Sequence, residues 1–199
     1  MGRLVFVTGG ARSGKSTFAE TLARQHGGRV CYVATASASD AEMARRIAHH
    51  RARRPADWNT VEITGSLADA LTTAGRDHDL LLIDCLTVYL VRLLPPDLPD
   101  DASVDGDTVD ALNAAVDAEV RALLDAVRGS PADAIVVSNE VGSGLVPPYP
   151  SGRLFRDLVG RANQALARAA DRAFVVIAGL PLDLTALQAT DSIWERGRS

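Results

Sequence analysis

The sequence contains little cysteine, few aromatic residues and no long apolar run. Its two cysteines, Cys31 and Cys85, both lie in apolar stretches. We expect them to be buried free thiols of a reducing, cytoplasmic environment rather than a disulfide. The longest uncharged apolar runs, such as Phe174 to Leu180, fall far short of the roughly 20 residues of a membrane span, so no span is expected. Met1 to Thr8 lead directly into a strand-like run and lack the layout of a signal peptide.

Positive charge is supplied almost entirely by arginine. Of the 21 Lys and Arg residues, 20 are arginine, and Lys15 is the one lysine. We infer that the chemistry at position 15 needs a compact ammonium rather than a planar guanidinium. The net charge of −4 gives no support for a basic surface that binds nucleic acid, so a DNA-acting ATPase is disfavoured.

Short apolar runs alternate with longer segments of helical periodicity along the 199 residues. The runs are rich in Val, Ile and Leu on both faces, which is typical of a parallel sheet covered by helices on both sides. The alternation predicts a single α/β domain over residues 1–199. The expected strands are Leu4–Thr8, Val30–Ala34, Asn59–Ile63, Leu80–Asp84, Ala134–Asn139 and Ala173–Gly179. The expected helices are Lys15–His26, Asp40–Arg54, Ser66–Gly75, Val109–Val127 and Leu154–Asp171.

Two segments fall outside this alternation. Pro95 to Asp110 contain six aspartates and three prolines but no Lys or Arg, which predicts an acidic loop insertion rather than a domain boundary. The polar tail at residues 185–199 carries no clear element, and we expect it to fray.

A phosphate-binding loop is the strongest motif. Residues 9–16 match G-x-x-x-x-G-K-[ST], and they lie between an expected strand and an expected helix, as the motif requires. Glycines let successive N–H groups turn toward phosphate oxygens, and the helix N-terminus adds its positive end. Lys15 would reach the β- and γ-phosphates, and the Ser16 hydroxyl would bind Mg²⁺. The expected nucleotide contacts in the loop are Gly9, Gly10, Ala11, Arg12, Ser13, Gly14, Lys15 and Ser16.

A carboxylate beside the magnesium is expected at Asp84. It ends the apolar run Leu80–Asp84, as in the Walker B pattern, and ligands of open α/β sheets bind beyond the carboxyl ends of strands. The alternative is an aspartate that caps the following helix. The fold class is therefore predicted as P-loop NTPase-like, with a mostly parallel sheet and helices on both faces. A GTPase that reads guanine with N-K-x-D is excluded, because that motif needs a second lysine.

The expected helix 40–54 carries the pair His49 and His50. At 100° per residue, His50 falls on the apolar stripe with Met43, whereas His49 lies on the side of several arginines. Guanidinium groups favour a neutral imidazole and attract phosphate, so His49 could attack a phosphorus atom. Spacing alone favours a solvated basic helix with two surface histidines over a nucleophile.

These motifs together resemble a known family, the bifunctional adenosylcobinamide kinase / adenosylcobinamide-phosphate guanylyltransferases of cobalamin synthesis. The resemblance runs in order over roughly residues 4–182. Beyond the phosphate loop, its most specific parts are the His-His-Arg and Arg-Pro-Ala-Asp-Trp combinations. The segments that carry it are 7–16, 32–36, 40–43, 46–47, 49–50, 54–58, 84–87, 138–142 and 160–164.

The resemblance implies two reactions. A nucleoside triphosphate, ATP or GTP, phosphorylates the aminopropanol hydroxyl of adenosylcobinamide, and GMP is then transferred from GTP to that phosphate, releasing pyrophosphate. The first histidine of the pair carries GMP in this family, and here that position is His49. A homo-oligomer is implied as well, with a trimer as the expected state.

The remaining site residues follow less directly. Glu62 is a candidate guanine reader, since a carboxylate accepts the N–H groups of guanine, and its alternative is an exposed strand acid. Glu140 could bind magnesium or take the hydroxyl proton, or it could be a loop acid. Further expected nucleotide contacts are Ala34, Thr35, Ala36, His50, Arg51 and Arg53, of which the arginines could instead be a solvated face.

Two other functions fit part of the sequence. A P-loop kinase of a small metabolite would use the loop and Asp84 but leave His49 unused. A non-catalytic regulator that binds nucleotide and docks a partner could use the acidic segment 95–110.

Overall fold

The structure is a computed structural model that describes residues 1–36, 45, 51, 54–96, 98 and 104–187. Its centre is a seven-stranded sheet in the order β3-β2-β4-β5-β1-β6-β7. Neighbouring strands are parallel throughout, except that β7 runs antiparallel to β6. The strands are β1 Leu4–Thr8, β2 Val30–Ala34, β3 Asn59–Glu62, β4 Leu80–Asp84, β5 Asp133–Val137, β6 Arg172–Ile177 and β7 Leu180–Asp183. The predicted fold class, a mostly parallel α/β sheet with helices on both faces, is confirmed.

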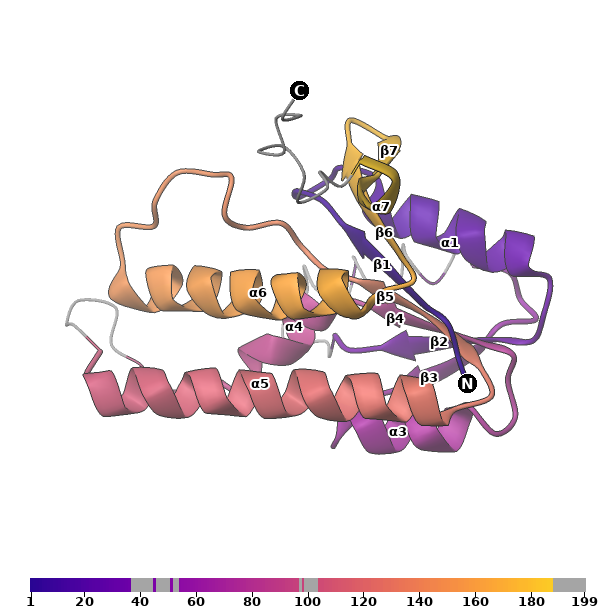
Figure 1. Ribbon diagram of the computed structural model, residues 1–199, viewed down its shortest axis with the longest axis horizontal. Helices are drawn as coiled ribbons and strands as arrows, with labels where there is room; N and C mark the ends of the chain where they lie inside the picture. Colours follow the sequence, from indigo (N-terminus) through magenta and orange to yellow (C-terminus); the bar gives the residue numbers. More distant parts are fainter. Residues whose placement is uncertain (37–44, 46–50, 52–53, 97, 99–103, 188–199) are drawn as a thin grey trace, which may run out of the picture.

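Helices cover the two faces of the sheet unequally. One face packs on α1, and the other packs on α3, α5 and α6, which lie together on the near side in Figure 1. This division follows from the alternation of side chains along each strand. The helices are α1 Lys15–His26, α3 Leu67–Ala74, α4 Leu86–Val91, α5 Gly106–Gly129, α6 Pro150–Ala169 and α7 Leu184–Leu187. Among the described residues, no helix is long and apolar enough to cross a membrane.

The strand β7 was not predicted, and the reason lies in its turn. Ala178 and Gly179 have φ values of 52° and 83°, so the chain reverses in a two-residue turn and pairs Leu182 with Val175. An Ala-Gly pair gives a weaker turn signal than Asn-Gly, and the expected strand therefore ran through Gly179. The short helix α7 likewise corrects the prediction that no element follows Leu184. Residues 188–199 lie outside the described residues.

The acidic segment is shorter than predicted. Helix α5 begins at Gly106, so residues 106–110 are helical rather than part of a loop. Asp105 caps the helix, because its Oδ1 accepts the backbone N–H of Thr108 at 2.9 Å. Asp107 then lies in the first turn, where the helix dipole favours negative charge. The composition of this segment indicated a loop, but Asp105 and Asp107 stabilise the start of a helix.

The predicted free thiols are confirmed, although their burial differs. Cys31 is buried in β2, whereas Cys85, which follows β4, is only half-buried. Burial raises the pKa of each thiol to about 11, so both remain protonated at neutral pH.

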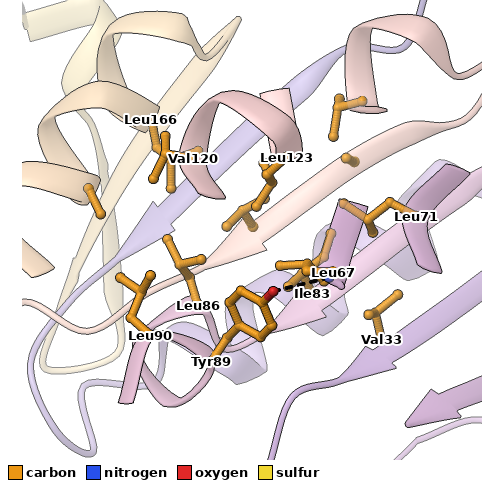
Figure 2. Packing of buried hydrophobic residues seen from close by; sticks show 14 of the residues in the cluster. Val33, Leu67, Leu71, Ile83, Leu86, Tyr89, Leu90, Val120, Leu123 and Leu166 are labelled. Carbon is orange, nitrogen blue, oxygen red and sulfur yellow. Dashed lines mark hydrogen bonds between the residues drawn. The ribbon is translucent and has the colours of Figure 1, made fainter. Parts of the chain in front are cut away.

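Tyr89 of α4 joins three helices at the centre of the larger core (Figure 2). Its hydroxyl accepts the backbone N–H of Leu67 at 3.2 Å and donates to Glu119 Oε2 at 2.9 Å. Leu67 is the first residue of α3, where backbone N–H groups have no partner within the helix. The tyrosine therefore satisfies a buried donor as well as filling space.

We expect Tyr89→Phe to lower the free energy of unfolding by about 1–2 kcal/mol, because the Leu67 N–H loses its partner in the core. Urea unfolding followed by circular dichroism measures the change. The control is Tyr149→Phe, at a residue that is 57 % exposed, and it should change stability by less than about 0.5 kcal/mol. Equal stability of the two variants would contradict the role assigned to the Tyr89 hydroxyl.

Candidate active site at the carboxyl edge of the sheet

The phosphate loop connects β1 to α1 in the predicted place. Gly14 has φ 94° and ψ 3°, and a Cβ there would approach Gly179 Cα to 3.2 Å. A Cβ on Gly9 would lie 2.5 Å from the carbonyl oxygen of Val176, so the loop cannot accept a side chain at that position. The glycines are therefore required by the close approach of the β6–β7 turn as well as by phosphate.

The side chain of Lys15 folds back over the phosphate loop. Its ammonium donates to the carbonyl oxygen of Gly10 at 3.1 Å, and the residue is buried. Within the described part of the chain, Ser13 Oγ is buried without a hydrogen-bond partner. A buried hydroxyl of this kind in a phosphate loop fits a hydrogen bond to a bound phosphate.

Neighbouring elements fix the loop on two sides. The backbone N–H of Glu140 donates to Gly9 O at 2.9 Å, and that of Gly179 donates to Ser13 O at 2.8 Å. The loop is therefore held in shape before any ligand binds, which lowers the entropy lost on binding.

Asp84 ends β4 at the same edge. The strand registers pair Asp84 with Ala34 of β2 and with Val137 of β5, and Val137 with Val7 of β1. Burial and the Asp84 charge raise the pKa of the Cys85 thiol, and the Lys15 ammonium opposes them, so Lys15 lies within electrostatic reach of this strand end. Two strand spacings, about 10 Å, separate β4 from β1. Loop and carboxylate can therefore approach the phosphates of one nucleotide from two sides.

Ser16 and Asp84, the residues predicted to hold magnesium, have a chemistry that fits this ion. Ser16 is half-exposed in the first turn of α1, and Asp84 is half-buried at the edge, so each can offer one oxygen. Magnesium binds through one or two protein oxygens together with substrate phosphates and water. Among the described residues, no group of three His, Cys, Asp or Glu side chains forms a metal cage.

A polar network that the sequence analysis missed lies beside Asp84. Thr35 Oγ1 donates to the carbonyl oxygen of Cys85 at 2.7 Å. Thr87 Oγ1 accepts the backbone N–H of Asn139 at 2.7 Å and lies 3.0 Å from Ser138 Oγ. Only Thr35 was predicted. The available signal was position, since all of these residues follow the ends of buried strands.

Glu140 is brought to the site, but part of its carboxylate is already used. Its Oε1 accepts the backbone N–H groups of Gly142 at 2.6 Å and Ser143 at 3.1 Å, which closes a turn after β5. The predicted loop role is therefore present, and these turn contacts use only the Oε1 atom of the carboxylate.

Other predicted residues lie farther from the loop. Glu62 is exposed at the end of β3, four strand spacings or about 19 Å from β1. It does pair in register with Ala34, and Ala36 follows at the same edge. Arg12 is exposed in the loop with φ 57°.

The histidine segment is only partly described. His49, His50 and Arg53 lie outside the described residues, whereas Arg51 is helical and exposed. Arg54 follows, and its guanidinium carbon lies 3.2 Å from the centroid of the Tyr32 ring.

Comparison with known proteins identifies this arrangement. Residues 5–184 match the family model described as cobinamide kinase / cobinamide phosphate guanyltransferase. The chain is 43 % identical over 178 residues to the bifunctional adenosylcobalamin biosynthesis protein CobP of Pseudomonas aeruginosa, covering 89 % of this chain and 95 % of that one. It is 40 % identical over 177 residues to the corresponding CobU of Escherichia coli, covering 89 % and 97 %.

Among solved structures, the RadB recombinase matches 87 % of this chain and 73 % of its own, with 17 % identity and a TM-score of 0.47. The family match extends over almost the whole described chain and includes every element that carries the phosphate loop and Asp84. The chain therefore belongs to the cobinamide kinase / cobinamide phosphate guanyltransferase family.

Proposed function

We propose that both reactions of the family take place at the carboxyl edge of this sheet, with the nucleotide held by residues 9–16 and with His49 as the acceptor of GMP. The chain has cobinamide kinase and cobinamide phosphate guanylyltransferase activity, using ATP or GTP, in cobalamin biosynthesis. The observation that carries the proposal is the phosphate loop with Lys15 folded over it and Asp84 at the same edge. The specific form of cobinamide that we propose as the substrate is adenosylcobinamide, which is phosphorylated at its aminopropanol hydroxyl.

In the kinase step, the corrinoid hydroxyl attacks the γ-phosphorus while the bond to the β,γ-bridging oxygen breaks. Lys15 and the loop N–H groups hold the phosphates and balance their charge. Ser16 and Asp84 would hold magnesium, which supplies further neutralisation of the phosphate charge. Glu140 would take the hydroxyl proton through Oε2, because its other oxygen closes the turn.

In the transfer step, an imidazole nitrogen of His49 bonds to the α-phosphorus of GTP as the bond to pyrophosphate breaks. An oxygen of the corrinoid phosphate then bonds to this phosphorus, and the P–N bond breaks to restore His49. Arg51 and Arg53 steady the phosphates, and their charge keeps the imidazole neutral and nucleophilic. His50 is proposed as a further contact of the nucleotide.

The base of GTP would extend from the loop along the edge of the sheet. Ala34, Thr35 and Ala36 lie at the end of β2 on that path. Glu62 lies beyond them on β3, where its carboxylate would accept the N–H groups of guanine. A nucleotide bound in this direction would place its guanine near Glu62, although Glu62 lies about 19 Å from β1.

We propose a homo-oligomer, with a trimer as the expected state, in a cytoplasmic enzyme. An apolar strip that includes the outer strand supports assembly. Burying such a strip against another copy removes apolar area from water and covers the free edge of β7. Its exposed members are Ile177, Leu180, Leu182, Leu184 and Leu187.

We expect His49→Ala to lose guanylyl transfer by more than about a thousandfold and to retain kinase activity, because only the second reaction uses the imidazole as a nucleophile. The measurement is incubation with Mg²⁺ and GTP labelled at the α-phosphate, followed by denaturation and peptide mapping. Label should be acid-labile, base-stable and located on the His49 peptide.

The matched control is His78→Ala, at the opposite edge of the sheet, which should be labelled like the unchanged protein. Retained GMP transfer in His49→Ala would reject the covalent scheme. An unlabelled but nucleotide-binding protein would favour a plain metabolite kinase or a regulator.

We expect Lys15→Arg to lower kcat/KM of both reactions by about a hundredfold or more, because a planar guanidinium cannot occupy the space of the ammonium above Gly10 O. Steady-state kinetics of each reaction, assayed separately, measure the loss. Arg24→Lys, also on α1 and 43 % exposed at its side chain, is the control and should stay within about twofold. A loss confined to one reaction would contradict a shared phosphate site.

We expect Leu180→Asp, which adds charge to a residue that is 70 % exposed on β7, to dissociate the oligomer. Size-exclusion chromatography with light scattering should show the mass fall toward that of one 21.0 kDa chain. Thr73→Glu, on an exposed position of α3, should leave the mass unchanged. A monomeric unchanged protein would contradict the proposal directly.

A further inference from the structure

Tyr32 lies against the carboxylate that the proposed function assigns to magnesium. The residue is buried in β2, with 3 % of its surface exposed, and its hydroxyl donates to Asp84 Oδ2 at 3.1 Å. A buried phenol is expensive to desolvate unless its hydroxyl finds a partner. Here the partner is not a backbone carbonyl of the core but an edge carboxylate.

The strand register makes this contact possible. Asp84 pairs with Ala34 on the neighbouring strand, and Tyr32 is two residues earlier on the same face. The ring therefore extends along the strand toward the carboxyl edge, and its hydroxyl meets the carboxylate from inside the protein. A shorter side chain at position 32 would not reach it.

Arg54 covers the ring from outside the sheet. Its guanidinium carbon lies 3.2 Å from the ring centroid, and among the described residues its buried Nε has no hydrogen-bond partner. A guanidinium over an aromatic face is stabilised electrostatically, more so when water is excluded. The Arg-Pro-Ala-Asp-Trp segment, whose Trp58 N–H donates to Pro55 O, thus begins with a residue that fixes the position of Tyr32.

The hydrogen bond from Tyr32 occupies one of the two carboxylate oxygens of Asp84. The bond therefore holds Oδ2 and leaves Oδ1 of the carboxylate for the site.

We propose that Tyr32 is a positioning residue, held by Arg54, that orients the Asp84 carboxylate toward the metal side of the bound nucleotide. The inference rests on the proposed role of Asp84. It differs from a simple packing role, because phenylalanine would fill the same space and keep the contact with Arg54. Loss of a hydrogen bond to a metal-binding group commonly weakens metal binding by about ten- to a hundredfold.

The test is the affinity of Mn²⁺ for the full-length protein saturated with a non-hydrolysable GTP analogue, measured by the electron paramagnetic resonance of free Mn²⁺. We expect Tyr32→Phe to weaken Mn²⁺ binding by about tenfold, while affinity for the analogue without metal stays within about twofold. Tyr149→Phe is the matched control and should leave both affinities unchanged. The Mg²⁺ concentration for half-maximal kinase rate should rise in parallel with the Mn²⁺ dissociation constant.

Arg54 is tested in a double-mutant cycle. Arg54→Met keeps an apolar stem of similar length and removes the charge over the ring. It should weaken Mn²⁺ binding in the unchanged background but have little further effect in Tyr32→Phe, where no hydroxyl remains to be positioned. Additive effects would overturn the coupling of Arg54 through Tyr32.

Asp84→Asn separates the inference from the function on which it rests. If Asp84→Asn weakens Mn²⁺ binding and Tyr32→Phe does not, the inference fails and the proposed role of Asp84 stands. If Asp84→Asn has no effect, the metal role of Asp84 fails, and Tyr32 cannot act through it. Equal losses of metal and metal-free nucleotide affinity in Tyr32→Phe would indicate general distortion and also overturn the inference.

Discussion

The candidate active site depends on the alignment of the carboxyl ends of four neighbouring parallel strands. The registers from β2 to β1 align Ala34, Asp84, Val137 and Val7, so a carboxylate two strands away reaches the edge that bears the phosphate loop. The N-terminus of α1 adds the positive end of its dipole at that edge. A one-residue slip of β4 would turn Asp84 to the opposite face and leave its strand end apolar. Correct pairing of buried strands is thus a condition for the chemistry as well as for stability.

Local sequence signals were sufficient to predict the bounds of an element whose own residues mark where it begins and ends. The bounds of β1, β2, β4 and α1 were predicted correctly, because buried strands form continuous apolar runs and the loop motif fixes the start of the helix. The same signals were insufficient for elements that form only because of packing against neighbouring elements. The helix α4 has six residues and depends on packing around Tyr89, which periodicity over so short a segment cannot indicate.

The same distinction applies to the site. The phosphate loop is contiguous, so its residues and their roles could be inferred from spacing. Tyr32, Arg54 and Asn139 come from a strand, a connection and a strand end that are far apart in sequence, and only the sheet order brings them near Asp84. A single sequence does not reveal that order. Glu62 shows the converse, since its residue type fitted a guanine reader but its distance from the loop depended on the place of β3 at the sheet edge.

Two reactions at different phosphorus atoms can share this site because of the way charge is distributed in each. In the kinase step the β- and γ-phosphates are the leaving group and the transferred group, and in the guanylyl step they leave together as pyrophosphate. If the loop binds these phosphates in both reactions, as proposed, negative charge develops on the same groups, and the same preorganised N–H groups and ammonium would stabilise both transition states. What must differ is the nucleophile and its approach. In the proposed scheme the second activity uses an added nucleophile beside the α-phosphate rather than a second nucleotide site, and the histidine pair before Arg54 is the sequence feature that the phosphate loop and Asp84 leave unexplained.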